Sequence, residues 1–101
     1  MKEDVLFELE EKEKYTILSF RMEKNLVPSA LYNLSPPNVN TRKGLILNGR
    51  GPIWLYAFLV HFYHPTPFLA VYDPRVGAVV IASHVPEFRP GDVLDIYLGE
   101  G

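Results

Sequence analysis

The residues of this sequence that could do chemistry gather between Thr41 and Arg75. Asn48, Gly49, Arg50 and Gly51 follow an apolar run and precede an aromatic-rich segment. A turn between a strand and a helix offers unpaired backbone N–H groups and the positive end of the helix dipole to an anion such as phosphate. An ordinary tight turn with a solvated Arg50 would explain the same residues, and the sequence leaves both interpretations open. P-loop and dinucleotide-binding fingerprints are both incomplete here, so neither ATP nor NAD is supported.

Two histidines lie three positions apart in the aromatic-rich segment. His61 and His64 share a face if this segment is helical, and His64 stands at its end beside two prolines. His64 could act as a general acid or base or bind a metal, because an unperturbed imidazole titrates near neutral pH. His61 lies among apolar residues, which favours a core or surface role. Ser83 and His84 end another apolar run, but a hydrolase triad is disfavoured because the sequence lacks a nucleophile elbow.

Asp73 and Arg75 directly follow the apolar run 68–72. In open α/β sheets the ligand crevice lies outside the carboxyl ends of parallel strands, where Asn48 and Arg50 are also expected. Asp73 could there hold a hard cation such as Mg²⁺ or Mn²⁺, and Arg75 could neutralise phosphate charge. We expect the intervening helix to carry His64 to the same rim. The alternative is a surface pair between Asp73 and Arg75, which would contribute little.

The elements that must position these residues follow from hydrophobic periodicity and turn signals. A strand, a glycine turn, a helix and a second buried strand form a βαβ unit, whose right-handed crossover makes the two strands parallel. We predict an α/β fold: one compact domain over residues 1–101, with a mixed sheet, this central βαβ unit and flanking helices. The predicted strands cover 4–10, 15–23, 43–47, 68–72, 78–82 and 93–98, and the predicted helices 28–34 and 51–63.

Composition narrows the class of protein. Hydrophobic residues make up 48% of the 101 residues, which excludes a disordered chain and fits one domain with a real core. The net charge of −2 argues against a general nucleic-acid coat, yet Arg42, Lys43, Arg50 and Arg75 oppose Asp73 alone in the centre of the chain. This local balance suggests an anionic ligand there. Without cysteine, a signal-peptide core or a long apolar segment, the chain is expected to be soluble and cytoplasmic, with no membrane partner.

Several motifs together resemble one known family. They are the runs NGRGPIWL (48–55), TPF (66–68), AVYDPR (70–75) and GAVV (77–80), with His64 between the first two. The chain resembles the Csx-three family of small CRISPR-associated ring nucleases over nearly its whole length, most closely from Thr41 to His84. The run GRGPIWL is far more specific than a generic glycine loop.

The resemblance implies a dimeric relative of the CARF, Rossmann-like fold. In that family a manganese-dependent phosphodiesterase cleaves cyclic tetra-adenylate and thereby switches off the type III CRISPR response; Mg²⁺ is a second candidate metal. By position it implies His64, Asp73 and Arg75 as catalytic residues, with Asp73 and His64 as the metal ligands. The turn 48–51 would contact the ring. Two dimers sandwich one ring, and groups from both sides contribute to the active site.

Two other functions stay open on the sequence. One is a module that binds or senses the cyclic oligoadenylate without turnover. The other is a manganese-dependent exonuclease that removes adenylates from RNA 3′ ends, an activity that the resemblance also implies. Both alternatives share the adenylate phosphodiester with the ring nuclease, so rates on the ring and on linear RNA would separate them.

Overall fold

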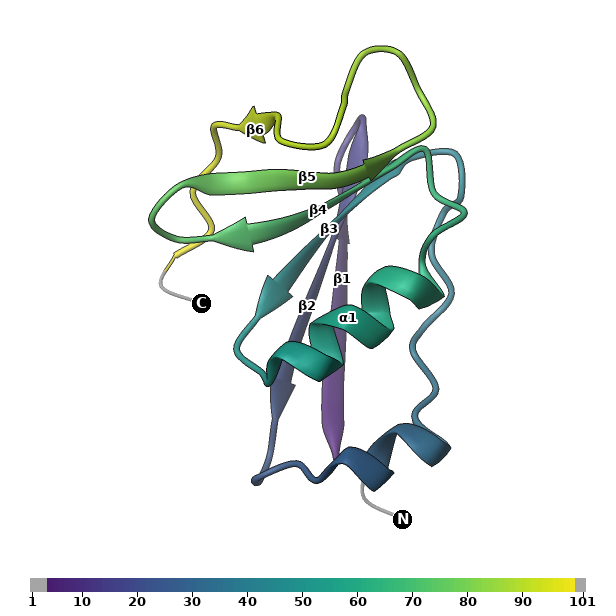
Figure 1. Cartoon of the computed structure of the whole chain (residues 1–101), viewed down its shortest axis with the longest axis vertical. Helices are drawn as coiled ribbons and strands as arrows, with labels where there is room; N and C mark the ends of the chain where they lie inside the picture. The colour runs from purple at the N-terminus through teal and green to yellow at the C-terminus, as the bar shows by residue number, and fades with distance from the viewer. Residues whose placement is uncertain (1–3, 100–101) are drawn as a thin grey trace.

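A six-stranded mixed sheet whose strands lie side by side in sequence order forms the centre of the protein (Figure 1). The computed structural model describes residues 4–99. The strands are β1 (Val5–Glu11), β2 (Tyr15–Met22), β3 (Gly44–Gly49), β4 (Phe68–Asp73), β5 (Gly77–Ser83) and β6 (Val93–Leu94). A short 3-10 helix, η1 (Pro28–Asn33), follows β2, and the α-helix α1 (Ile53–Phe62) joins β3 to β4.

The strand pairing confirms the predicted hairpin and the predicted βαβ unit. β1 and β2 pair antiparallel around the charged link 12–14, and β3 pairs parallel with β4 through α1. β2 also pairs parallel with β3, which the sequence did not indicate. The segment after β2 returns through η1 to the starting edge of the sheet, as the crossover through α1 does. Three neighbouring strands, β2 to β4, therefore end at the same edge.

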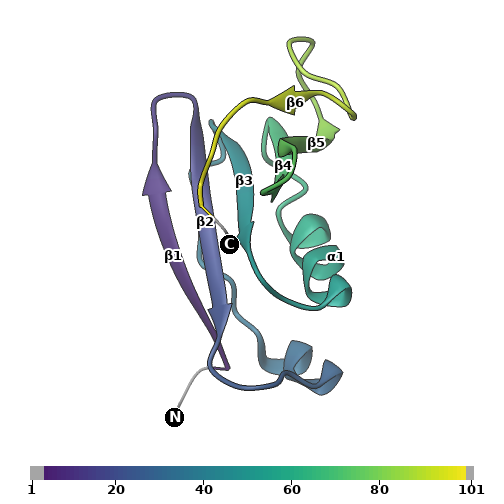
Figure 2. The same cartoon turned by 90° about the vertical axis from the view of Figure 1, so that its left-hand side faces the viewer.

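One face of the sheet is covered by α1 and by the segment around η1 (Figure 2). Leu55 and Leu59 of α1 are fully buried against sheet residues such as Leu18 and Leu47. Apolar side chains of 26–39 pack beside them on the same cluster. α1 and the η1 segment therefore share one apolar layer on this face of the sheet.

The other face is covered by an extended segment, so the helices that the sequence predicted to flank the sheet lie on one face only. Within residues 4–99, α1 is the only α-helix, and both it and η1 lie on the first face. Phe88, Leu94, Ile96 and Leu98 instead pack over a second apolar cluster that contains Tyr72. The predicted strand 93–98 shortens to two residues because the chain turns across the sheet, where the Leu98 N–H donates to the Tyr72 hydroxyl at 2.9 Å. Within the described chain, neither helix has the length and apolar composition needed to cross a membrane.

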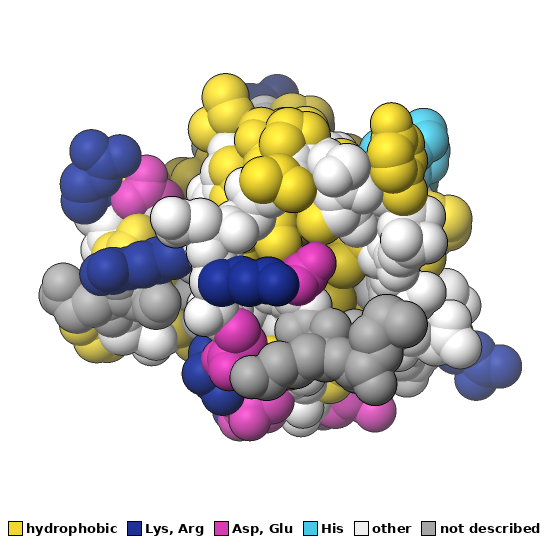
Figure 3. All heavy atoms as spheres, turned by 90° about the horizontal axis from the view of Figure 1, so that it is seen from below, with side chains coloured by type: hydrophobic (Ala, Val, Ile, Leu, Met, Phe, Trp, Pro, Cys, Tyr) yellow, Lys and Arg dark blue, Asp and Glu magenta, His cyan; other side chains and the backbone are white. Residues whose placement is uncertain are grey.

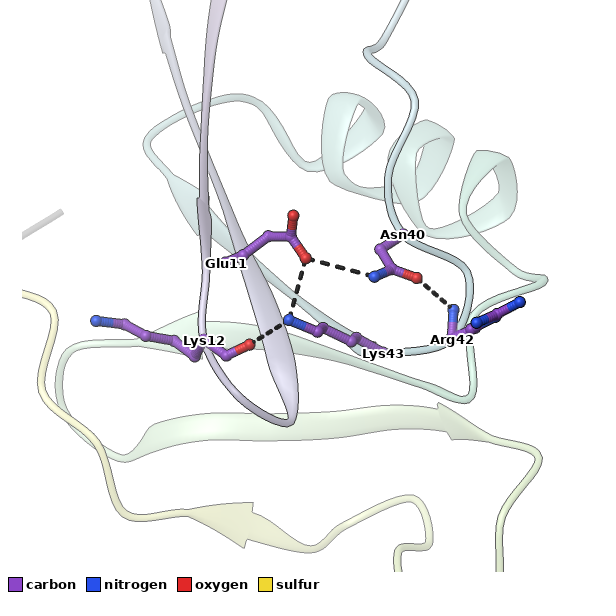
Figure 4. A network of polar contacts seen from close by, with 5 residues as sticks. All are labelled: Glu11, Lys12, Asn40, Arg42 and Lys43. Carbon is purple, nitrogen blue, oxygen red and sulfur yellow. Dashed lines mark hydrogen bonds and ion pairs between the residues drawn. The ribbon is translucent and has the colours of Figure 1, made fainter.

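A polar network ties the β1–β2 hairpin to the loop before β3 (Figure 4). Lys43 Nζ lies 3.1 Å from a Glu11 carboxylate oxygen and donates to the Lys12 carbonyl at 2.6 Å. Asn40 also reaches Glu11, at 3.4 Å. The side-chain hydrogen bond from Lys43 is the main reason that the pKa of Glu11 is lowered. Exposed networks of this kind contribute little stability, and the pairing of β2 with β3 holds the hairpin in place.

The position of α1 generates a stability prediction. Leu59→Ala should lower the free energy of unfolding by about 2 to 5 kcal/mol, because it empties a fully buried site between helix and sheet. Ile53→Ala on the same helix is the matched control. Its side chain is 87% exposed, so the change should stay within about 0.5 kcal/mol. Urea denaturation of both variants measures the difference; equal effects would contradict this packing of α1.

Candidate functional site

The turn after β3 and the Asp-Pro-Arg segment after β4 meet at one cleft. β3 ends at Gly49 and β4 at Asp73, and the two strands run parallel. The cleft between them has a volume of about 440 Å³. Its lining residues are Gly49, Ile53, Tyr56, Val71, Tyr72, Asp73, Pro74 and Arg75. The structure thus brings together, at the carboxyl edge of the sheet, two motifs that the sequence separates by more than twenty residues.

Asp73 and Arg75 form a two-point ion pair at this cleft. Arg75 Nε donates to Asp73 Oδ1 at 3.3 Å and Nη2 to Oδ2 at 3.2 Å, while the Arg75 backbone N–H donates to Oδ1 at 2.9 Å. These hydrogen bonds lower the pKa of Asp73 and raise that of Arg75, so both groups are charged at neutral pH. The Arg75 side chain is 87% exposed. Asp73 therefore orients a guanidinium that can still meet an anion from outside.

The glycine turn is held by Tyr56, to which the sequence reasoning gave no role at the turn. The Gly49 N–H donates to the Tyr56 hydroxyl at 3.0 Å, and that hydroxyl donates back to the Gly49 carbonyl. A side chain could not fit at Gly49, since a Cβ there would lie 2.4 Å from the Phe20 carbonyl oxygen. Because Tyr56 occupies the Gly49 N–H, an anion here would have to use the exposed Arg50 and the N–H groups at the start of α1.

His64 lies at the opposite end of the sheet, so the expectation that α1 carries it to the Asp73 rim is wrong within one chain. A crossover helix between parallel strands begins where the first strand ends and must return to where the second begins. His64 follows α1 and precedes β4, whose far end is Asp73. The spacing of the residues suggested proximity, but the direction of the helix excludes it. The catalytic and metal-binding roles of these residues stay predictions.

His64 is paired with His84 at the end of the sheet where β2, β3 and β4 begin, which we call the amino edge. Their ring centroids lie 4.8 Å apart with planes at 82°, and His84 Nε2 lies 3.1 Å from the His64 carbonyl oxygen. The buried Thr66 hydroxyl, 2.9 Å from the Tyr63 carbonyl, fixes the turn that presents His64. Both histidines are exposed, as is His61. The sequence left the place of His84 open, and the structure puts it beside His64.

The Ser83 hydroxyl is engaged locally. It donates to the Val85 carbonyl at 2.9 Å and accepts from the Val85 N–H at 3.1 Å. Asp73 lies at the other end of the neighbouring strand, because Phe68 pairs with Ser83 and Asp73 with Gly77. A single chain therefore does not assemble a triad from Ser83, His84 and Asp73.

The locally basic centre of the sequence is divided between the two edges. Arg42 and Lys43 precede β3 at the amino edge, where Lys43 is paired with Glu11 (Figure 4). Arg50 and Arg75 lie at the carboxyl edge. Figure 3 views the molecule from the end toward which β2 and β3 point, and there basic side chains lie beside acidic ones around a hydrophobic area. Each edge thus carries a few separate Arg or Lys side chains instead of a continuous basic surface.

The metal-ligand set predicted for one site does not converge in one chain. Residues 4–99 contain no cluster of three or more His, Asp or Glu side chains that could hold a metal ion. Asp73 is bound to Arg75, and His64 stands at the other edge. A divalent cation bound through both residues would need ligands from more than one copy of the chain.

Comparison with known proteins places the sequence in a family. The model of the CRISPR-associated protein family Cas_csx3 matches residues 19–95. The chain belongs to this family. A protein of Aquifex aeolicus (strain VF5), described only as uncharacterized, is 48% identical over 84 residues, which cover 78% of this chain and 76% of the relative. The Cas_csx3 match begins within β2 and extends through β6, and it leaves β1 outside.

The hydroxyl of Tyr56 generates a prediction about the glycine turn. Tyr56→Phe should lower the free energy of unfolding by about 1 to 3 kcal/mol, because it leaves the N–H and C=O of Gly49 without their partner. Tyr32→Phe, at an 87% exposed side chain on η1, is the control and should change stability by less than about 0.5 kcal/mol. Thermal unfolding followed by circular dichroism compares the two; an unchanged midpoint for Tyr56→Phe would show that the hydroxyl does not hold the turn.

Proposed function

We propose that this Cas_csx3 family member is a ring nuclease, a metal-dependent phosphodiesterase that cleaves cyclic tetra-adenylate to linear adenylates and so ends type III CRISPR signalling. Family membership supports the CRISPR context. The observation that carries the proposal is the division of the site-like residues between opposite edges of one sheet. Each edge offers a different half of a phosphodiester-cleaving site.

The two edges complement each other chemically. The carboxyl edge supplies Arg75, oriented by Asp73, and the exposed start of α1, which suit phosphate oxygens. The amino edge supplies the exposed imidazole of His64, which can transfer protons, and the lining of the cleft at the carboxyl edge contains no imidazole. A ring lying between two copies would contact the carboxyl edge of one and the amino edge of the other. In this arrangement the ring is sandwiched between two copies of the chain.

In the complete site, Arg75 stabilises the charge that develops on the phosphoryl oxygens, and Asp73 keeps the guanidinium in place. Arg50 and the backbone N–H groups at the start of α1 hold a neighbouring phosphate. His64 from the facing copy transfers a proton or orients the scissile group. Each role needs only a group that the corresponding edge exposes.

Mn²⁺ is the proposed cofactor, with Mg²⁺ as a substitute. Asp73 of one copy and His64 of the facing copy are the candidate protein ligands, and phosphate oxygens of the ring could supply further ones. A divalent cation would add Lewis-acid stabilisation of the phosphoryl group. Because one chain does not present this ligand set, tight metal binding should require the assembled complex.

A homodimer is the proposed unit on each side of the ring. The ten residues of α1 include no Asp, Glu, Lys or Arg, and only Leu55 and Leu59 are buried. Its outer side is therefore apolar surface that a second copy could cover without opposing charges. A two-fold dimer would meet opposite halves of a four-phosphate ring with the same residues.

The decisive experiment combines single variants with their mixture. His64→Ala and Asp73→Ala should each lower the rate of Mn²⁺-dependent cleavage of labelled cyclic tetra-adenylate by at least about a hundredfold, because each removes a group from the reacting centre. Mixing the two variants should restore part of the activity. In an equal mixture, about one interface in four would place a carboxyl edge with intact Asp73 against an amino edge with intact His64.

The control is Asp95→Ala, an exposed acid outside the cleft, which should keep the wild-type rate. Unimpaired cleavage by the two single variants would overturn the proposal, and inactive mixtures would overturn the two-copy site. Tight binding without a linear product would instead support a sensor module, and faster cleavage of linear poly-adenylate would support a 3′-end exonuclease.

A further inference from the structure

A second cavity opens on the sheet beside the glycine turn, on the face opposite α1. It has a volume of about 410 Å³ and is formed by β1, β2 and the end of β3. Its lining residues are Leu6, Phe7, Glu8, Ser19, Phe20, Arg21, Asn48 and Gly49. Phe7 and Phe20 pack toward the α1 side, so the alternating positions Leu6, Glu8, Ser19, Arg21 and Asn48 point into the cavity.

The floor of this cavity is a row of polar side chains across three strands. Glu8 pairs with Ser19, and Ser19 with Asn48, in the sheet register. Neighbouring strands lie about 4.8 Å apart, so the row spans about 10 Å, which is enough for the edge of a purine. Farther along this face, on β3, β4 and β5, the side chains form an apolar cluster that the C-terminal segment covers. The polar row is therefore a local feature at the carboxyl edge.

Some hydrogen-bond donors and acceptors of the row already bond within the protein, and the others are available to a ligand. Asn48 Nδ2 donates to Ser19 Oγ at 3.3 Å and thereby orients the amide. Asn48 keeps its Oδ1 acceptor and a second N–H donor, and Ser19 keeps its own O–H donor. Arg21 is paired with Glu23 at 3.1 Å, so its charge is already compensated. Glu8 adds one acceptor carboxylate. The cavity thus offers alternating acceptors and donors, together with the negative charge of Glu8.

Such a pattern suits a heteroaromatic base better than a free anion or a metal ion. An Asn amide can accept from the N6 amino group of adenine and donate to its N7 in one plane. Leu6 supplies an apolar contact, and the exposed Arg21 guanidinium can stack on a base. Gly49 lines this cavity and also the cleft at Asp73. A nucleotide whose phosphate lies at the turn could therefore place its base here.

We infer that this cavity, formed by Glu8, Ser19, Arg21 and Asn48, is an adenine-reading pocket of the ligand site. The inference rests on the proposed function, because it assigns a place to a base of the adenylate ring. Asn48 is the specificity-determining residue, and Ser19 positions its amide. Hypoxanthine carries a carbonyl in place of the N6 amino group, so it would oppose its oxygen to the acceptors of Asn48 and Glu8.

The test compares binding of cyclic tetra-adenylate and cyclic tetra-inosinate without divalent cation, so that cleavage does not intervene. The wild type should prefer the adenylate ring by about tenfold to a hundredfold, the effect of one two-point base contact. Asn48→Leu should bring this ratio close to one. Ser19→Ala should lower the ratio in the same direction while leaving the end of β3 unchanged. Asn38→Leu, at an exposed loop position, is the control and should keep the wild-type ratio.

A ratio within each protein cancels differences in folded fraction between variants. Equal affinities of the wild type for the two rings would overturn the pocket, as would an unchanged ratio in Asn48→Leu and Ser19→Ala. Adenine preference without cleavage in a parallel Mn²⁺ assay would retain the pocket and remove the nuclease. Cleavage of both rings, bound with equal affinity, would support the nuclease and overturn the pocket. Binding of neither ring would overturn both the pocket and the nuclease.

Discussion

The direction of three neighbouring strands constrains the rest of this structure. β2, β3 and β4 run parallel, so the chain between each pair must return along the length of the sheet. The first return passes through η1 and the second through α1, both on one face. Residues that directly follow β3 therefore lie at the carboxyl edge, and residues that directly precede β4 lie at the amino edge. The turn remains at the carboxyl edge, and His64 arrives at the amino edge.

Packing strengthens this arrangement locally. Tyr56, one turn into α1, fastens the glycine turn to the helix, and Gly49 approaches the β2 backbone too closely for any side chain. At the other edge, Thr66 and the contact with His84 set the position of His64. The two ends of α1 are therefore fixed separately. An oligoadenylate placed between copies would meet two chemically different surfaces.

Much of the fold could be predicted from the sequence, because apolar runs and turn residues mark each strand locally. The hairpin, the βαβ unit and the convergence of the turn with Asp73 and Arg75 followed from these signals. The parallel pairing of β2 with β3 and the C-terminal cover depend on long-range packing that no local pattern encodes. The role of Tyr56 was missed because it lies seven positions after Gly49 in the sequence. His64 was placed at the wrong edge because the direction of the helix was not considered together with the spacing. The roles of His64, Asp73 and Arg75 rest on resemblance and on the proposed two-copy site.

The central claim is that the amino edge of one copy faces the carboxyl edge of another across the ring. The chain has no cysteine, so one can be introduced at each edge, as Pro65→Cys beside His64 and as Val76→Cys beside Arg75. Both positions are exposed. With cyclic tetra-adenylate present and divalent cation absent, a short thiol-reactive cross-linker should join the two variants to each other, and much less in either variant alone. Cross-linking that does not depend on the ring, or that is equally efficient within each variant alone, would contradict the account.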